Sequence, residues 1–255
     1  ADREWFRRYG AASNAEIASI LNSADAIYGE QLGLSLALVG QNAQSGTTQP
    51  YSTNAAEQLL AQFRAAVLTR RVRLPEADVY HLFTGRDLES GVIGLAYFGV
   101  VCKDPTASFS LTQFLNPAVT FLTTTHEIAH NLGAVHDAAP GFIMAPSLGS
   151  TVPTSFSPES RADIAEFVRV NGPACLEARD VPPTPVPTAT ATPDPNATPS
   201  PPTATPTPRP TATPRGGGGG GSGSGGSGSG SGSGTTVALK VSLRSDGRFL
   251  ADISG

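Results

Sequence analysis

The stretch that decides the fold is His126-Glu127-Ile128-Ala129-His130-Asn131-Leu132-Gly133-Ala134-Val135-His136-Asp137. On a helix, His126 and His130 lie four residues apart, so both imidazoles project from one face and can share one Zn²⁺. Gly133 can end that helix in a left-handed turn, and the turn can bring His136 round as a third ligand. Three protein ligands and one open position are typical of a catalytic zinc.

Glu127 lies beside the first of these ligands, where a carboxylate can take a proton from an activated water. A short H-E-x-x-H pattern also occurs by chance. A structural zinc would be expected to have a fourth ligand, but Asp137 directly follows His136, which makes chelation by both awkward. Three of the four histidines in the chain fall within eleven positions. The pattern therefore predicts a catalytic zinc site.

The long motif resembles that of the metzincin peptidases. Asp137, directly after the third histidine, resembles the residue that the adamalysin (reprolysin) branch carries at that place. A metzincin also needs a Met-turn, and the only methionine is Met144, followed by Pro146 where astacins and serralysins carry Tyr. The segments 82–87 (LFTGRD) and 93–97 (IGLAY) also resemble the adamalysin stretch before the zinc helix.

This resemblance covers roughly residues 1–179 and implies a zincin-like α/β fold. We expect a mixed, twisted sheet of four to five strands with long helices, and zinc in a cleft below the edge strand. The implied activity is a zinc endopeptidase that acts on proteins or peptides with Glu127 as general base. The alternative is an inactive zinc-containing adhesion or binding module on a stalk, and the intact Glu127 argues against it.

The resemblance also implies supporting roles for other residues. Met144 would form an apolar floor below the ligands without binding the metal, Asp137 would anchor the turn under the site by hydrogen bonding, and Gly133 would form that turn. Gly94, Leu95 and Ala96 would be the edge-strand segment that pairs with the substrate backbone. Without the resemblance, an ordinary core strand is the simpler interpretation of those three residues.

The two cysteines, Cys102 and Cys175, lie far from the histidines and form no C-x-x-C pair. Two buried thiols and one disulfide both fit this pattern, and an extracellular enzyme favours the disulfide. The resemblance implies a Cys102–Cys175 bond.

A calcium site rests on one residue. Asp78 aligns with a calcium ligand of some adamalysins, but Ala178 stands where those proteins carry Asn. A plain exposed or capping Asp is the alternative. His81, the one histidine outside the motif, is interpreted as a structural strand residue.

Hydrophobic periodicity and capping patterns predict an alternation of helices and strands, which indicates an α/β sheet covered by helices. We expect helices over 2–9, 14–29, from 54, 116–132 and from 157, and strands over 34–39, 78–83, 92–101 and 108–115. Adamalysin-like domains usually open with a strand, so we expect a first strand upstream of Ala1.

Composition divides the chain into unlike parts. Thirteen of the 22 prolines lie in 182–214 and thirteen of the 28 glycines lie in 216–234. Such segments cannot bury a core, so we expect residues 180–234 to be a disordered linker. Apolar alternation in 235–255 predicts the start of a truncated C-terminal β domain. Pro/Thr stalks are typical of secreted bacterial enzymes, and we expect a secreted or cell-surface protein.

Net charge and hydropathy exclude other classes. Residues 1–180 carry 12 Lys and Arg against 18 Asp and Glu, a net charge of −6. An acidic domain without a basic patch argues against a nucleic-acid partner. The sequence contains no apolar run approaching the roughly 20 residues of a membrane span. We expect a monomer.

Overall fold

The computed structural model describes residues 1–46, 49–179 and 237–244. The linker predicted for 180–234 and the end of the predicted β domain, 245–255, lie outside these described residues. In the described parts, no helix combines the length and the apolar character that crossing a membrane requires.

The described chain alternates helices and strands, which confirms the predicted α/β class. The helices are α1 (Arg3–Tyr9), α2 (Ser13–Leu32), α3 (Ala56–Leu68), α4 (Pro117–Asn131) and α5 (Pro158–Asn171), with 3₁₀ turns at Gly10–Ala12, Glu89–Gly91 and Gly172–Ala174. The strands are β1 (Leu34–Gln41), β2 (Val79–Thr84), β3 (Gly94–Ala96), β4 (Phe109–Gln113), β5 (Glu177–Arg179) and β6 (Val237–Arg244).

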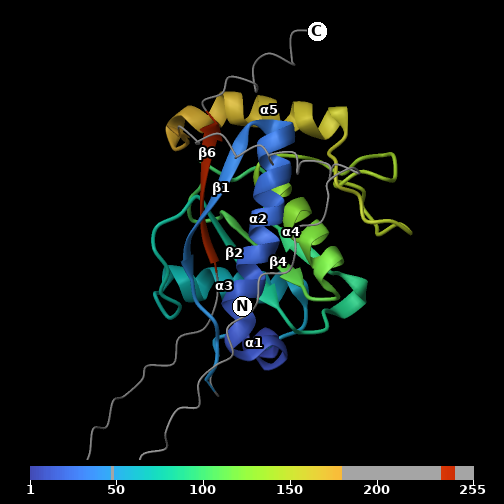
Figure 1. Cartoon of the computed structure of the whole chain (residues 1–255). Coiled ribbons are helices and arrows are strands. Elements are labelled where there is room, and N and C mark those ends of the chain that lie inside the picture. The colour runs from blue at the N-terminus through green and yellow to red at the C-terminus, as the bar shows by residue number, and fades with distance from the viewer. Residues whose placement is uncertain (47–48, 180–236, 245–255) are drawn as a thin grey trace, which may run out of the picture. The chain divides into compact units, whose positions relative to one another are not determined.

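The strands form one mixed sheet in the order β1-β6-β2-β4-β3, with β5 pairing beside β6 (Figure 1). β2 and β4 are parallel, as are β5 and β6, and the other neighbouring pairs are antiparallel. β3 is the last strand on its side of this order. The predicted sheet of four to five mixed strands is therefore confirmed by the main path of five.

Helices cover both faces of the sheet, and each face has its own apolar core. α2 packs on β1, and α4 packs on β4 beside α2. Their cluster includes the buried side chains of Ile17, Leu36, Phe83 and Ile128. α3 covers the opposite face, where Phe63 packs with Phe109 and other side chains in a second cluster. Helix α4 is thus held in place by its packing against the sheet.

The helix that carries the histidine motif begins at a well-defined cap. Asn116 accepts a hydrogen bond from the Val119 N–H at 3.0 Å, and Pro117 takes the first helical position, where its missing N–H costs nothing. Helix α5 begins in the same way, with Ser157 accepting from the Ser160 N–H at 2.9 Å before Pro158.

β3 is shorter than the strand predicted over 92–101. It spans only Gly94–Ala96, because the chain then leaves the sheet and bonds to the end of α4. The Gly99 N–H donates to the His130 carbonyl at 2.8 Å, and the Val100 N–H donates to the Asn131 carbonyl at 3.0 Å. The last carbonyls of a helix lack the usual partner one turn later, and the segment after β3 supplies donors to them.

The prediction that 235–255 begins a separate β domain differs from the structure at its described residues. Val237–Arg244 is instead strand β6 of the main sheet, between β1 and β2. The strand predicted from its apolar alternation is confirmed. A lone strand leaves its backbone groups unpaired, whereas this position satisfies both of its edges and buries both of its faces.

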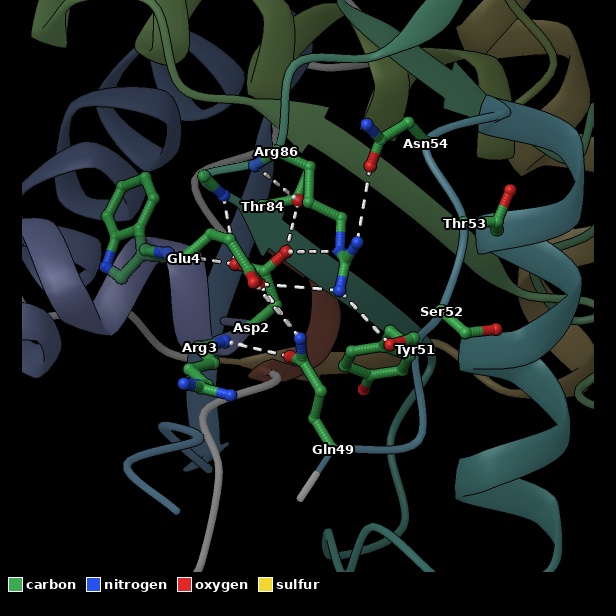
Figure 2. Close-up of polar contacts among 12 residues, drawn as sticks. Asp2, Arg3, Glu4, Gln49, Tyr51, Ser52, Thr53, Asn54, Thr84 and Arg86 are labelled. Atoms are coloured by element: carbon green, nitrogen blue, oxygen red, sulfur yellow. Dashed lines mark hydrogen bonds and ion pairs between the residues drawn. The ribbon is translucent and has the colours of Figure 1, made fainter. Parts of the chain in front are cut away.

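A buried carboxylate joins the first helix to the end of β2 (Figure 2). Asp2 caps α1 by accepting from the Trp5 N–H at 2.9 Å, and it also accepts from the Gly85 N–H at 3.0 Å and from the Thr84 hydroxyl. The Arg86 guanidinium lies 3.5 Å from the same carboxylate. Burial raises the pKa of Asp2. The network fixes the point where the chain leaves β2.

Candidate metal centre and active site

Helix α4 brings two of the three motif histidines together. His126 and His130 lie four residues apart on it, and their ring centroids are 4.6 Å apart. On the buried side of the helix, Ile128 and Ala129 are fully buried together with polar side chains such as Thr124. The histidines therefore project from the side of the helix that is turned away from the core.

A glycine turn then brings the third histidine round. Gly133 has φ +88°, its N–H bonds to the His130 carbonyl at 3.0 Å, and the Ala134 N–H bonds to the Ala129 carbonyl at 3.0 Å. This pair of bonds is the Schellman arrangement that ends a helix. A side chain on Gly133 would also meet the Phe167 ring at 2.8 Å. The turn predicted at Gly133 is thus required by both backbone and space.

The three rings converge on one point. The Nε2 atom of His136 lies 3.2 Å from that of His126 and 3.0 Å from that of His130. The Nδ1–H of His126 donates to the Ile143 carbonyl at 2.7 Å, and that of His130 donates to the Ala134 carbonyl at 2.7 Å. Because carbonyls only accept, both rings hold their proton on Nδ1 and turn an Nε2 lone pair to the centre.

This donor set fits a zinc ion. Tetrahedral Zn²⁺ with Zn–N bonds of ~2.0–2.1 Å places its ligand nitrogens about 3.3 Å apart, close to the spacing seen here. The backbone carbonyls behind His126 and His130 are the usual outer partners of metal-binding imidazoles. Among the described residues, these three side chains are the group of metal-ligating type that lies close enough to hold one ion.

Burial keeps the two helical imidazoles neutral, as a metal ligand must be. The pKa of His126 is lowered to about 4, chiefly because burial penalises the charged ring. The pKa of His130 is also lowered, again chiefly by burial. At neutral pH both Nε2 atoms are therefore free to bind a cation without first losing a proton.

Glu127 lies under the edge strand, against the backbone of Gly94. A methyl group added to Gly94 would meet Glu127 Oε1 at 2.4 Å and Thr123 Cγ2 at 2.5 Å. The carboxyl group is almost fully buried, and burial raises the pKa of Glu127 to about 8. A nearby cation would favour the ionised form and lower that pKa. The site thus holds a carboxyl group whose pKa lies near neutral pH.

The segment after the third histidine is locked to helix α5. Asp137 accepts hydrogen bonds from the hydroxyls of Ser157 at 2.5 Å and Ser160 at 2.7 Å. Its N–H donates to the Met144 carbonyl at 2.9 Å. Met144 itself is fully buried in the core. These contacts are the kind of support expected of Asp137 and Met144, and their effect on the site stays a prediction.

A cavity of about 500 Å³ opens beside Glu127 and His126. The segment Ser90–Gly94 forms one wall, Leu122 and Thr123 of α4 form another, and the chain between Pro140 and Pro153 closes the far side. Within the described residues, β3 pairs only with β4, so its outer edge is open. Gly94, Leu95 and Ala96 are half-buried there. An extended peptide could lie along that edge and place one side chain in the cavity.

Asn131, inside the motif, has a contact that the motif does not predict. Its Nδ2 donates to the Tyr97 carbonyl at 2.8 Å and to the Phe109 carbonyl at 3.1 Å. The buried amide therefore ties the end of β3 and the start of β4 to α4. The one signal for Asn131 in the sequence is its position between His130 and His136. Ser160, which holds Asp137, was also missed, although it lies one helical turn after the predicted helix start at Ser157.

Cys102 and Cys175 are bonded, which confirms the predicted pair and ties the segment after β3 to the end of α5.

Asp78, the residue on which the predicted calcium site rests, contacts strand β6. Its carboxylate accepts from the Val241 N–H at 2.8 Å and pairs with Lys240 Nζ at 3.1 Å. A calcium role for Asp78 stays a prediction that no contact described here tests.

Known proteins resemble this chain over the same region. The reprolysin-like metallo-peptidase family M12B matches residues 14–137. Mouse disintegrin and metalloproteinase domain-containing protein 11 is 28% identical over 171 residues, which cover 62% of this chain and 22% of that protein. Snake venom metalloproteinase TM-1 of Protobothrops mucrosquamatus is 37% identical over 106 residues, 39% of this chain and 52% of that protein.

A third relative, the zinc metalloproteinase-disintegrin-like brevilysin H2a of Gloydius brevicauda, is 27% identical over 166 residues, 62% of this chain and 39% of that protein. The chain thus spans between about a fifth and a half of the length of these relatives. The family match ends at Asp137 and so includes all three histidines and Glu127. The comparisons therefore support the reprolysin-like metallopeptidase family M12B for residues 14–137 of this chain.

Proposed function

We propose that this chain is a zinc-dependent endopeptidase in which His126, His130 and His136 hold the metal and Glu127 is the general base. The observation that carries the proposal is the convergence of three Nε2 atoms beside a buried carboxyl group and an open strand edge. A zinc ion bound there supplies Lewis acidity, which makes a water molecule nucleophilic near neutral pH and polarises the scissile carbonyl.

The protein's own groups then orient the reaction. Glu127 accepts a proton from the attacking water and returns it to the leaving amine. Its pKa of about 8, lowered by a neighbouring cation, suits both transfers near pH 7. The Ile143 and Ala134 carbonyls fix the rings of His126 and His130, so the Nε2 atoms of these two residues need little reorganisation.

The substrate is proposed to bind as an added strand. Backbone groups of Gly94–Ala96 would pair with an extended peptide along the open edge of β3. The adjoining cavity is lined by apolar side chains such as Leu122, Ile143 and Leu148, and Glu127 is the one carboxylate among its described lining residues. We therefore expect an uncharged, apolar substrate side chain beside the scissile bond.

The compartment is inferred from the disulfide. A Cys102–Cys175 bond persists in oxidising surroundings, which supports the proposal that the protein is extracellular. Its alkylation pattern after isolation from the native source, without reductant, would show whether the bond forms there.

The decisive experiment compares Glu127→Ala with the unchanged chain. Hydrolysis of a mixed peptide library should fall by about 10²–10⁴-fold because the proton acceptor is lost. Bound zinc, measured by elemental analysis, should stay at one per chain because no ligand changes. Glu57→Ala, which alters an exposed carboxylate on α3, is the matched control and should cleave normally.

A chelator should abolish cleavage by the unchanged chain, and added zinc should restore it. Cleavage that survives both Glu127→Ala and chelation would disprove the mechanism. Stoichiometric zinc without cleavage of any library peptide would instead favour the inactive binding module.

A further inference from the structure

Strand β6 is joined to the rest of the domain by far more chain than its position needs. Residues 180–236, 57 in number, separate it from β5, its parallel neighbour. A chain leaving β5 must return only the length of one eight-residue strand, about 25 Å at ~3.3 Å per residue. About eight extended residues could make that return. The tether is therefore several times longer than the connection requires.

The place that β6 fills is a gap between two strands. Within the described sheet, β1 and β2 are not paired with each other, and each bonds to β6. Without β6, both would present rows of unpaired N–H and C=O groups. β1 would then be separated from the β2-β4-β3 part of the sheet. The gap thus has the character of a groove that accepts one strand.

The groove has distinct requirements on its two faces. Val237, Leu239 and Val241 are at most 2% exposed and join the core cluster shared with α2 and α4. On the other face, Ala238 is fully buried. A methyl group added to Gly40 of β1 would lie 3.7 Å from the Ala238 Cβ and 2.4 Å from the Pro75 ring. A larger side chain at position 238 would meet Gly40 and the adjoining Pro75 ring.

Asp78 extends recognition beyond the end of β2. The last paired residues on that side are Val79 and Leu239. Beyond them, the Asp78 N–H donates to the Leu239 carbonyl at 2.9 Å. Its carboxylate accepts from the Val241 N–H at 2.8 Å and pairs with Lys240 Nζ at 3.1 Å. The Asp78 side chain therefore contacts both a backbone N–H of the strand and the charged side chain at position 240.

We propose that β1 and β2 form a strand-acceptor groove, and that the segment 237–244 of this chain binds it as a ligand whose retention does not depend on the tether. The groove recognises apolar residues at alternate positions, a small residue at 238 and a lysine opposite Asp78. The proposal concerns assembly of the sheet and does not rest on the proposed peptidase activity.

Cross-linking tests the register in the full chain. Ser35 of β1 lies opposite Ser242, so Ser35→Cys with Ser242→Cys should form a disulfide under mild oxidation. Ser35→Cys with Arg244→Cys, two residues out of register at a position outside the proposed recognition residues, is the matched control and should remain largely reduced. Peptide mass mapping identifies the bond. Absence of the first cross-link, or equal yields from both variants, would overturn the proposal.

Cleavage of the tether tests retention. A site for an unrelated sequence-specific protease is placed within 216–234, in the full chain carrying Glu127→Ala so that self-cleavage is removed. After the cut, the C-terminal fragment should co-elute with the domain in gel filtration. Asp78→Ala should accelerate its release by about tenfold or more, since a charge-assisted hydrogen bond is lost. Glu76→Ala, an exposed carboxylate two residues away, should not.

Every outcome of the cut bears on the proposal. Co-elution that Asp78→Ala weakens supports it, and so do Ser35–Ser242 cross-links between two copies, because the groove then holds a strand supplied by another chain. Separation of the fragment at once, from a domain that stays folded or one that unfolds, overturns it. The circular dichroism of the eluted domain distinguishes these two forms of failure.

Discussion

Gly94 shows how closely the candidate site is fitted at the scale of single residues. The backbone of β3 passes so near to Glu127 and Thr123 that no side chain can stand between them. The edge strand and the carboxyl group proposed as general base are therefore positioned against each other directly. The strand itself does not require glycine at position 94. The contact with Glu127 and Thr123 does, because a side chain there would collide with both.

Gly94→Ala should lower peptide hydrolysis by about 10²-fold, because its methyl group displaces the Glu127 carboxyl by an ångström or more. Zinc content should not change, since the three histidines are untouched. Steady-state cleavage with elemental analysis measures both. Gly149→Ala, whose added methyl group would meet nothing closer than 3.9 Å, is the control in the same cavity. Equal activity of the two variants would contradict the role given to Gly94.

Asn131 is the second residue-scale test. Asn131→Ala removes the donors to the Tyr97 and Phe109 carbonyls and leaves the half-buried Tyr97 carbonyl without that partner. We expect the free energy of unfolding to fall by about 1–3 kcal/mol, measured by urea denaturation. Asn22→Ala, an exposed asparagine on α2, is the comparison. A loss no greater than that of the comparison would show that the amide does not tie β3 to α4.

At the scale of elements, a buried polar row joins β2 to β4. His81 Nδ1 lies 2.8 Å from Ser110 Oγ, and its Nε2 lies 3.1 Å from Thr112 Oγ1. Thr124 of α4 reaches the same Thr112 hydroxyl at 3.5 Å. The pKa of His81 is lowered to about 3, chiefly by burial and to a lesser extent by the charge of the N-terminal ammonium. His81 was predicted to be a structural strand residue, and these contacts agree.

This row predicts a dependence of stability on pH. The folded pKa of His81, about 3, lies below the unfolded value near 6.5, so between them the unfolded chain binds the extra proton. The free energy of unfolding should therefore fall by up to about 1.4 kcal/mol for each pH unit below about 6.5 through this group. Urea denaturation at pH 7, 6 and 5 measures the slope.

His81→Gln keeps hydrogen-bonding groups but does not titrate, so its slope should be smaller by about one proton. The three site histidines are present in both proteins, and the difference isolates His81. Identical slopes would mean that His81 is already charged in the folded protein or is not buried there.

At the scale of the whole molecule, the disulfide and β6 each join segments that lie far apart in the sequence. The Cys102–Cys175 bond spans 73 residues and encloses α4 and the site within its loop. In the chain-entropy account, a loop of that length contributes about 4 kcal/mol. Cys102→Ala with Cys175→Ala should lower the free energy of unfolding by about that amount in urea denaturation, with wild-type protein in reductant as a second comparison. A change below about 1 kcal/mol would contradict the estimate.

The local chemistry of the site follows from the sequence alone. Spacing along one helix places His126 and His130 on one face with Glu127 beside them, and a left-handed glycine follows from the same short stretch. Such features depend on neighbours within a few residues, which is why composition and spacing predict them. The same holds for the α/β alternation.

Only the tertiary structure decided the rest. The carbonyls of Ile143 and Ala134 set the tautomers of His126 and His130, the β3 backbone passes against Glu127 at Gly94, and β6 lies in the sheet where a separate domain was expected. These contacts join residues far apart in sequence. Apolar alternation predicts that a segment is a strand, but it does not name the partner, because any unpaired edge offers the same hydrogen bonds.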